Sequence, residues 1–244
     1  MTIVVPTLNE ATTIERLIDR VGAAMGPASD APPFELIVVD DDSPDETWRI
    51  AQDRADRDAR IRVIRRVGPR GLSSAVLAGM AMARGDVLVV IDADLQHDER
   101  CIPRLVAAID AGADVALGSR EVDGGGYGPF GRWRLGVSRL GAALARRAVG
   151  VEVSDPMSGF FAVSRDRYGE LAGQLNPRGF KILLEFLARG PEPEVAEIGY
   201  VFGRRAGGTT KFTGGVGAAF VVSVIELTVA RRLGRRRRAW PAGR

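Results

Sequence analysis

Short apolar runs of strand length alternate with amphipathic stretches along the first half of the chain. Between the runs, apolar side chains recur at helical spacing, as in Ile14, Leu17, Ile18 and Val21. The strand-like runs occupy residues 2–6, 34–39, 62–65, 87–91 and 114–117. Because the run at 87–91 is unbroken and rich in β-branched residues, we expect a central strand there, buried on both faces. The alternation predicts an α/β fold with a mostly parallel central sheet flanked by helices.

The other stretches extend this pattern with less regularity. Residues 75–81 are small and apolar, which favours a helix held close to the sheet. Further helices are predicted at residues 47–60, 103–111, 133–148 and 180–187, further strands at 161–163 and 195–202, and a Gly-, Thr- and Arg-rich loop at 203–215. Because no linker or internal repeat divides the chain, we expect one domain over residues 1–215 and a C-terminal helix with an Arg-rich tail over residues 216–244.

Polar and acidic side chains follow three of the predicted strands. Asn9 and Glu10 follow the first strand, residues 40–42 are three consecutive aspartates after the second, and Asp92 and Asp94 follow the strand at 87–91. Ligands of parallel sheets bind beyond the carboxyl ends of the strands, so we expect these groups to share one crevice. Two carboxylates one residue apart offer oxygen ligands that suit Mg²⁺ or Mn²⁺. An isolated Asp-x-Asp is more often only a polar strand exit, so the assignment depends on the neighbouring motifs.

Composition indicates a folded protein of an ordinary kind. Of the 244 residues 45% are hydrophobic and 27% charged, and Cys101 is the single cysteine. A lone cysteine excludes an internal disulfide framework and favours a reducing compartment, and we expect Cys101 to be a helix-packing residue. The formal net charge is +3, but arginines crowd the C-terminus at residues 231–238. This cluster is compatible with a solvated tail, an RNA-binding patch or a contact to anionic lipid headgroups.

The C-terminal segment gives the expected relation to membranes. Residues 216–230 are too few to span a bilayer, which takes ~20 apolar residues, and they contain Glu226. The chain begins directly with a strand-like run, so we expect no signal peptide. RNA binding would favour aromatic residues interleaved with the arginines, and only Trp240 accompanies them, so we expect no nucleic-acid partner. We expect a cytoplasmic protein whose C-terminal helix lies peripherally on the membrane surface.

Seven segments, read in order, resemble the motifs of family 2 glycosyltransferases, and within them the dolichyl-phosphate or polyprenyl-phosphate mannose synthases. They are VPTLNE at 5–10, VVDDDSPD at 38–45, GLSSA at 71–75, DADLQH at 92–97, GSR at 118–120, DPMSGF at 155–160 and GFKILLE at 179–185. Each motif alone is weakly specific, whereas seven in order are strong. The resemblance implies a GT-A fold with a Rossmann-like nucleotide-binding half and an acceptor half. It further implies a GDP-mannose donor, a polyprenyl phosphate acceptor and inversion at the sugar carbon.

The resemblance also implies a role for particular residues. The donor base pocket would be lined by Pro6, Leu8, Glu10, Val39 and Asp41. The metal and the donor pyrophosphate would be held by Asp92, Ala93, Asp94 and Gln96, with Asp92, Asp94 and Gln96 as metal ligands. The acceptor phosphate would meet Arg120, Arg134 and Ser138, and the donor site would be completed by Lys181, Arg205 and Lys211. Among these, the residues expected to act in catalysis are Asp94, Arg120 and Arg134.

Three departures from the family pattern are visible in the sequence. Leu8 occupies a position that is usually aromatic, which replaces stacking on the base by apolar contact. Longer members of the family add transmembrane helices, and we expect no such helix in this sequence. A membrane-embedded partner protein is therefore an open possibility. Thr210 stands where the basic loop usually has Ser, and this change retains the hydroxyl.

The chemistry suits these residues independently of the family. Loss of a nucleoside diphosphate builds negative charge on phosphates, which a divalent ion, Lys181 and Arg205 would stabilise. An acceptor phosphate is already anionic and needs positioning by arginines more than deprotonation, so no general base is assigned. His97, the only histidine, is interpreted as a loop or supporting residue.

Several alternatives stay open at the level of sequence. Glu10 could cap the first helix, Asp155 could only set a turn, and Lys181 with Glu185 could be a surface pair. A polyprenyl-phosphate glucose synthase, or another family 2 enzyme that uses a UDP-sugar, is the close alternative in function. Nucleotidyl transfer would require a Gly-rich phosphate loop after the first strand, which residues 6–10 do not resemble.

Overall fold

The computed structural model describes residues 1–26, 33–128, 143, 145, 146, 150, 152–177, 181–204 and 228. The predicted helix at 133–148 lies almost entirely outside these residues, as do the basic loop from residue 205 on and nearly all of the C-terminal segment. The described part of the chain holds no helix with the length and apolar character that crossing a bilayer requires.

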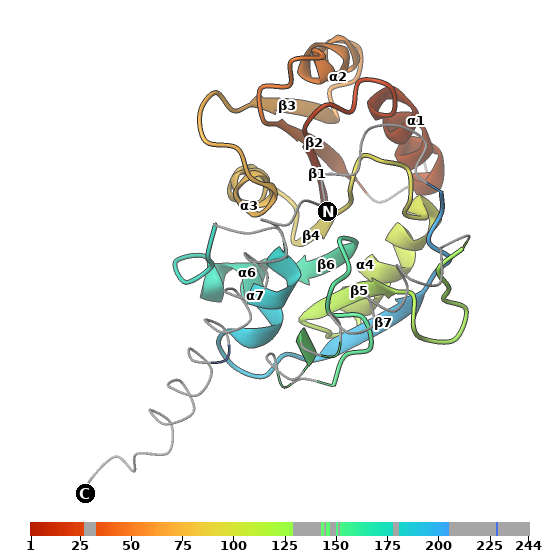
Figure 1. Ribbon diagram of the computed structural model, residues 1–244, viewed down its shortest axis with the longest axis vertical. Helices are drawn as coiled ribbons and strands as arrows, with labels where there is room; N and C mark the ends of the chain where they lie inside the picture. The colour runs from red at the N-terminus through yellow and green to blue at the C-terminus, as the bar shows by residue number, and fades with distance from the viewer. Residues whose placement is uncertain are drawn as a thin grey trace, which may run out of the picture.

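A single mixed sheet forms the centre of the described part of the chain (Figure 1). Its seven strands have the spatial order β3-β2-β1-β4-β6-β5-β7. They are β1 Thr2–Thr7, β2 Glu35–Asp40, β3 Ile61–Arg65, β4 Val87–Val90, β5 Val115–Ser119, β6 Phe161–Ser164 and β7 Val195–Gly199. All pairings are parallel except those of β6, which runs antiparallel to β4 and to β5. The mostly parallel sheet that the apolar runs predict is therefore present, with one reversed strand that they do not reveal.

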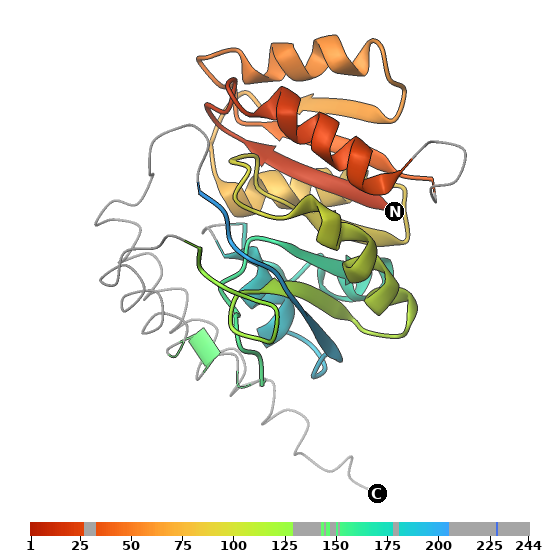
Figure 2. The ribbon, with the colours of Figure 1, turned by 90° about the vertical axis from the view of Figure 1, so that its right-hand side faces the viewer.

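Helices cover both faces of the sheet (Figure 2). They are α1 Ile14–Met25, α2 Thr47–Ala55, α3 Leu72–Met82, α4 Ile102–Asp110, α6 Arg165–Leu171 and α7 Ile182–Ala188, with a 3₁₀ turn η1 at Glu99–Cys101 before α4. The helices α1, α2 and α4 contribute to the hydrophobic cluster on one face, and α3, α6 and α7 to the cluster on the other. Each strand of the sheet centre is thus buried on both sides, which explains its continuous apolar sequence.

The contact of α3 with the sheet is unusually close, as its small residues predict. A Cβ atom on Gly79 would lie 2.5 Å from Cγ1 of Val4 and 3.0 Å from Cγ2 of Val39. Glycine at this position therefore lets the helix backbone settle directly on β1 and β2.

Differences from the predicted elements lie mainly in the second half. Helix α6 was not expected; it begins directly after β6, where the Ser164 hydroxyl accepts a hydrogen bond from the backbone N–H of Arg167 at 3.1 Å. Strand β7 ends at Gly199 and not at residue 202, because a turn crosses the chain there: a Cβ on Gly199 would lie 2.2 Å from the Asp123 carbonyl oxygen.

Candidate active site

Predicted site residues from several of the described segments lie at one edge of the sheet. Strands β2, β1 and β4 are neighbours and parallel, so their carboxyl ends open side by side. Strand β5 has the same direction, because both β4 and β5 run antiparallel to β6. Asp41 follows β2, Asp92 and Asp94 follow β4, and Arg120 follows β5 directly. The crevice expected from the strand ends is therefore supported by the topology.

The loops that follow β1, β2 and β4 each contain a non-glycine residue in the left-handed region of backbone space. Asn9, Asp42 and Leu95 have φ values of 57°, 52° and 61°. Non-glycine residues adopt this conformation at a cost of about 1–2 kcal/mol, so the surrounding contacts must hold the loops in place.

One set of such contacts is centred on the buried carboxylate of Asp40. Its Oδ2 accepts hydrogen bonds from the hydroxyls of Thr7 at 2.7 Å and Ser43 at 2.6 Å. The Ser43 oxygen in turn accepts from the backbone N–H of Asn9 at 2.9 Å. These bonds join the loop after β1 to the loop after β2.

A second set joins the same two loops further from the sheet. The Thr47 oxygen accepts from the backbone N–H of Glu10 at 2.9 Å, and Asp45 accepts from the N–H of Ala11 at 3.0 Å and from the Thr47 hydroxyl at 2.6 Å. Glu10 itself is buried, and its carboxylate accepts from the Thr13 hydroxyl at 3.2 Å. Glu10 thus lies at the start of α1 and also beside the loop after β2.

The residues assigned to a base pocket surround Asp41. Pro6 and Val39 are buried register partners on β1 and β2, and Leu8 is half-buried in the loop that follows. The Asp41 carboxylate is buried; Oδ2 accepts from the backbone N–H of Gly71 at 2.7 Å, and Oδ1 lies 3.2 Å from Nε of Arg66. An apolar floor with one anchored carboxylate suits a planar heterocycle that carries N–H donors.

Burial alternates strictly along the segment after β4. Ala93, Leu95 and His97 are buried. The three predicted metal ligands, Asp92, Asp94 and Gln96, are each half-exposed. The alternation therefore leaves all three side chains partly open to solvent.

The donor set of this segment fits a hard divalent cation. Two carboxylates and one amide are oxygen ligands, and Mg²⁺ or Mn²⁺ bound by so few leaves positions for phosphates and water. Within the described ranges no group of three or more His, Cys, Asp or Glu side chains gathers around a point where one ion could be held. The backbone at Gly159 packs closely against Asp92, because a Cβ on Gly159 would lie 2.7 Å from its Oδ2.

Gln96 also ties this segment to the exit of β7. Its carbonyl oxygen accepts from the backbone N–H of Gly203 at 2.7 Å, and its side-chain Nε2 donates to the Gly203 carbonyl at 3.0 Å. The segment that leads to the predicted basic loop therefore starts next to the metal motif.

Arg120 is held by a buried ion pair with Asp155. Its Nε and Nη2 donate to the two carboxylate oxygens at 2.6 and 2.7 Å, and its backbone N–H donates at 3.2 Å. The guanidinium lies 5.0 Å from the ring centroid of Tyr127 and 5.3 Å from that of Phe202. Burial alone would lower the pKa of Arg120, but the hydrogen bonds and charge of Asp155 outweigh it and raise the pKa. Asp155 therefore does more than set a turn: it fixes a permanent cation at the crevice.

Lys181 lies between the metal motif and this ion pair. It precedes α7, and its ammonium donates to the Met157 carbonyl at 2.8 Å. Burial lowers the pKa of Lys181, while the nearby charges of Asp92 and Asp155 act in the opposite direction. The structure thus brings this predicted donor-site cation to the same place as the carboxylates.

Comparison with known proteins agrees with this arrangement. Residues 2–171 match the family described as Glycosyl transferase family 2. The chain belongs to this family. A dolichol-phosphate mannosyltransferase of Pyrococcus furiosus is 41% identical over 216 residues, which are 88% of this chain and 59% of that protein. A dolichol-phosphate mannosyltransferase of Saccharomyces cerevisiae is 36% identical, with 93% and 86% of the two chains covered. The polyprenol monophosphomannose synthase of Mycolicibacterium smegmatis is 33% identical, with 96% and 89% covered.

Solved structures lead to the same family of glycosyltransferases. A glucosyl-3-phosphoglycerate synthase from Mycobacterium tuberculosis, crystallised with Mn²⁺, UDP and phosphoglyceric acid, superposes with a TM-score of 0.66 at 26% identity. The match covers 94% of this chain and 77% of that one. The predicted GT-A fold of a family 2 glycosyltransferase is thereby confirmed.

Four predicted site residues of this family 2 glycosyltransferase, Arg134, Ser138, Arg205 and Lys211, lie outside the described residues. Sequence reasoning missed the supporting roles of Asp40, Ser43 and Asp45, and it gave Asp155 no partner. The four aspartates of VVDDDSPD indicate that acids matter in this loop. The sequence does not show which of them faces the proposed base pocket and which holds the loops together, because that depends on the direction of each side chain.

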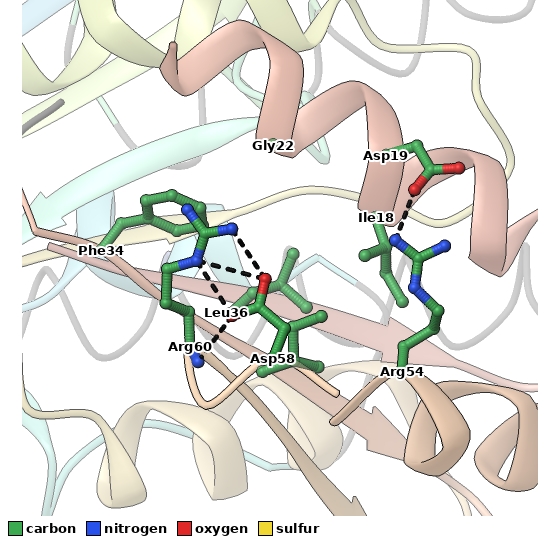
Figure 3. Close-up of a pocket in the computed structure, with 9 residues that line it drawn as sticks. Ile18, Asp19, Gly22, Phe34, Leu36, Arg54, Asp58 and Arg60 are labelled. Atoms are coloured by element: carbon green, nitrogen blue, oxygen red, sulfur yellow. Dashed lines mark hydrogen bonds and ion pairs between the residues drawn. The ribbon is translucent and has the colours of Figure 1, made fainter. Parts of the chain in front are cut away.

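A pocket of about 210 Å³ lies away from this edge, between α1, α2 and the starts of β2 and β3 (Figure 3). Its charged lining residues already pair with one another, Arg54 with Asp19 and Arg60 with Asp58. Because it lies at the starts of β2 and β3, the pocket is separate from the candidate site at the carboxyl ends of the strands.

Proposed function

We propose that this chain transfers mannose from GDP-mannose to a polyprenyl phosphate, with inversion at the sugar carbon and with Mg²⁺ or Mn²⁺ as cofactor. The main support for the proposal is that acidic and basic side chains lie close together at one edge of the sheet. They are Asp92, Asp94, Lys181 and the Arg120–Asp155 pair. The names of the archaeal, yeast and mycobacterial relatives support the sugar and the lipid phosphate.

On the donor side, the base would lie over Pro6 and Val39 with its N–H groups toward Asp41. Asp92, Asp94 and Gln96 would hold the divalent ion, which supplies charge neutralisation for the leaving diphosphate when bound. Lys181 adds a positive charge on the protein itself, and its partial burial makes that charge more effective than it would be in water.

On the acceptor side, the nucleophile is a phosphate oxygen that already carries negative charge. Arg120 is held in place by Asp155 before any substrate arrives. A prepositioned guanidinium lowers the entropic cost of bringing the acceptor phosphate to the sugar. Arg134, Ser138, Arg205 and Lys211 complete the proposed site.

The proposal is tested by replacing Asp94. Asp94→Ala should lower transfer of radiolabelled mannose from GDP-mannose to a short-chain prenyl phosphate by roughly 100-fold or more, because the site loses one of two carboxylates. Asp53→Ala, on the exposed face of α2, is the matched control and should retain full transfer. Full activity of Asp94→Ala would refute the assignment.

The same assay, run with other donors, tests the sugar. The solved synthase with UDP makes a UDP-sugar, such as UDP-glucose, the alternative donor. Selective use of UDP-glucose over GDP-mannose would replace the mannosyl proposal by a polyprenyl-phosphate glucose synthase.

We also propose that residues 216–244 bind the membrane surface on its cytoplasmic face. The support is compositional: an apolar segment is followed by clustered arginines, which favour anionic headgroups. Deletion of these residues should reduce co-sedimentation with anionic liposomes. Unchanged co-sedimentation would exclude this role for the tail.

A further inference from the structure

The only histidine of the chain lies in an aromatic enclosure behind the metal motif. His97 is buried, and its ring centroid is 5.3 Å from that of Phe160, 5.6 Å from Tyr200 and 5.4 Å from Phe202. Phe160 directly precedes β6, and the other two rings directly follow β7. Three segments that are distant in sequence therefore fix the orientation of one imidazole.

Both nitrogens of this imidazole face polar partners. Nδ1 lies 2.8 Å from the Tyr200 hydroxyl, and Nε2 lies 3.4 Å from Oδ2 of Asp92. An ionised carboxylate can only accept a hydrogen bond, so in neutral His97 the proton belongs on Nε2 and Nδ1 is an acceptor. The Tyr200 hydroxyl must then donate to Nδ1. Burial raises the pKa of Tyr200, which keeps that hydroxyl protonated.

A glycine keeps the space that this arrangement needs. A Cβ on Gly159 would lie 2.7 Å from Oδ2 of Asp92 and 3.6 Å from Nε2 of His97. Any larger residue at position 159 would therefore push the carboxylate or the ring out of place.

We propose that Tyr200 and His97 form a positioning relay, in which the tyrosine sets the histidine tautomer and the histidine holds one oxygen of Asp92. This contact would fix the orientation of the carboxylate that is proposed to bind the cation. The relay rests on the proposed metal-dependent function. His97 and Tyr200 are positioning residues, since they act through Asp92. Partners of this kind in metal sites typically change metal affinity 10–100-fold when they are lost.

The test measures Mn²⁺ binding directly. The protein is titrated with Mn²⁺ in the presence of GDP, and free Mn²⁺ is followed by electron paramagnetic resonance. His97→Phe fits an aromatic enclosure but has no N–H, and it should weaken Mn²⁺ binding about 10-fold or more. Tyr200→Phe removes only the first hydrogen bond and should weaken binding less. His97→Gln, which keeps an N–H donor, should recover part of the affinity.

Controls separate the relay from a loss of structure. Tyr168→Phe changes a partly buried tyrosine on α6 that packs on the opposite face of the sheet, and it should bind Mn²⁺ like the unaltered protein. Native Mn²⁺ affinity in both His97→Phe and Tyr200→Phe would overturn the relay. Absence of Mn²⁺ binding in the unaltered protein would overturn both the relay and the metal site. Normal Mn²⁺ binding without mannose transfer would instead refute the proposed substrates alone.

Discussion

At the scale of single residues, the site shows which assignments local sequence can carry. Asp92, Asp94 and Gln96 follow the end of β4 at every second position and alternate with buried residues, although the chain turns here and Leu95 has a φ of 61°. The pairing of Arg120 with Asp155 spans 35 positions, and an Asp before a proline gives the same turn signal whether or not it has a partner. The place of this acidic segment at a strand end was therefore predictable, and the ion pair was not.

This ion pair gives a prediction about stability and acceptor use. Asp155→Asn leaves the guanidinium of Arg120, which is only 12% exposed, without its counter-charge. Loss of one partner of such a pair costs about 3–5 kcal/mol, so the free energy of unfolding should fall by that order. Urea unfolding measures this change, and the KM for prenyl phosphate should rise more than the KM for GDP-mannose.

The double variant Asp155→Asn, Arg120→Met provides the control. It removes the unpaired buried charge and should regain stability without regaining acceptor use. Recovery of both properties would show that the pair only supports the fold.

At the scale of elements, strands and helices were predictable where each had its own pattern. Strands β1 to β5 occur within one or two residues of the apolar runs. Helix α6 has seven residues, too few to show a period, and β7 continues as an apolar run after the sheet has ended. No local pattern reports which strand pairs with which, so the reversed position of β6 between β4 and β5 required the structure.

Two helical glycines give contrasting predictions at this scale. Gly22 in α1 has no neighbouring atom within 4 Å of an added Cβ, so Gly22→Ala should stabilise the protein by about 0.5–1 kcal/mol. Gly79→Ala gains the same helix propensity but forces α3 off Val4, and it should destabilise by about 1–3 kcal/mol. Thermal unfolding of both variants measures the difference. A stabilised Gly79→Ala variant would contradict the close approach of α3 to β1.

At the scale of the whole molecule, the two edges of the sheet have different tasks. The carboxyl edge carries strained loops and half-exposed polar groups. At the amino edge, Glu35 joins β2 to β1, to β3 and to the loop after α3: it accepts from the Thr2 hydroxyl at 2.7 Å, Nη1 of Arg62 at 2.9 Å and the backbone N–H of Arg84 at 2.6 Å. The functional edge was predictable because polar residues interrupt apolar runs there. The stabilising edge was not, since a single glutamate carries no pattern.

Glu35 predicts a pH dependence of stability. Burial alone would raise its pKa, but these hydrogen bonds outweigh burial and lower the pKa below the usual 4.5. A lowered pKa in the folded state contributes stability that is complete above pH 4.5 and is lost as pH falls through the folded value. Glu35→Gln should therefore unfold more easily than the unaltered protein at pH 7, and the difference should shrink as the pH falls below 4.5. A difference that persists unchanged in acid would exclude this ionic origin.

Partly exposed and buried side chains alternate over residues 92–97, so the length of this segment matters as much as the identity of its residues. Removing Ile91 would move every later side chain of the segment one position closer to β4, so the carboxylates and the imidazole would no longer occupy their present partly exposed and buried positions. Related chains can therefore be expected to tolerate insertions in the surface turns but to keep this short count constant.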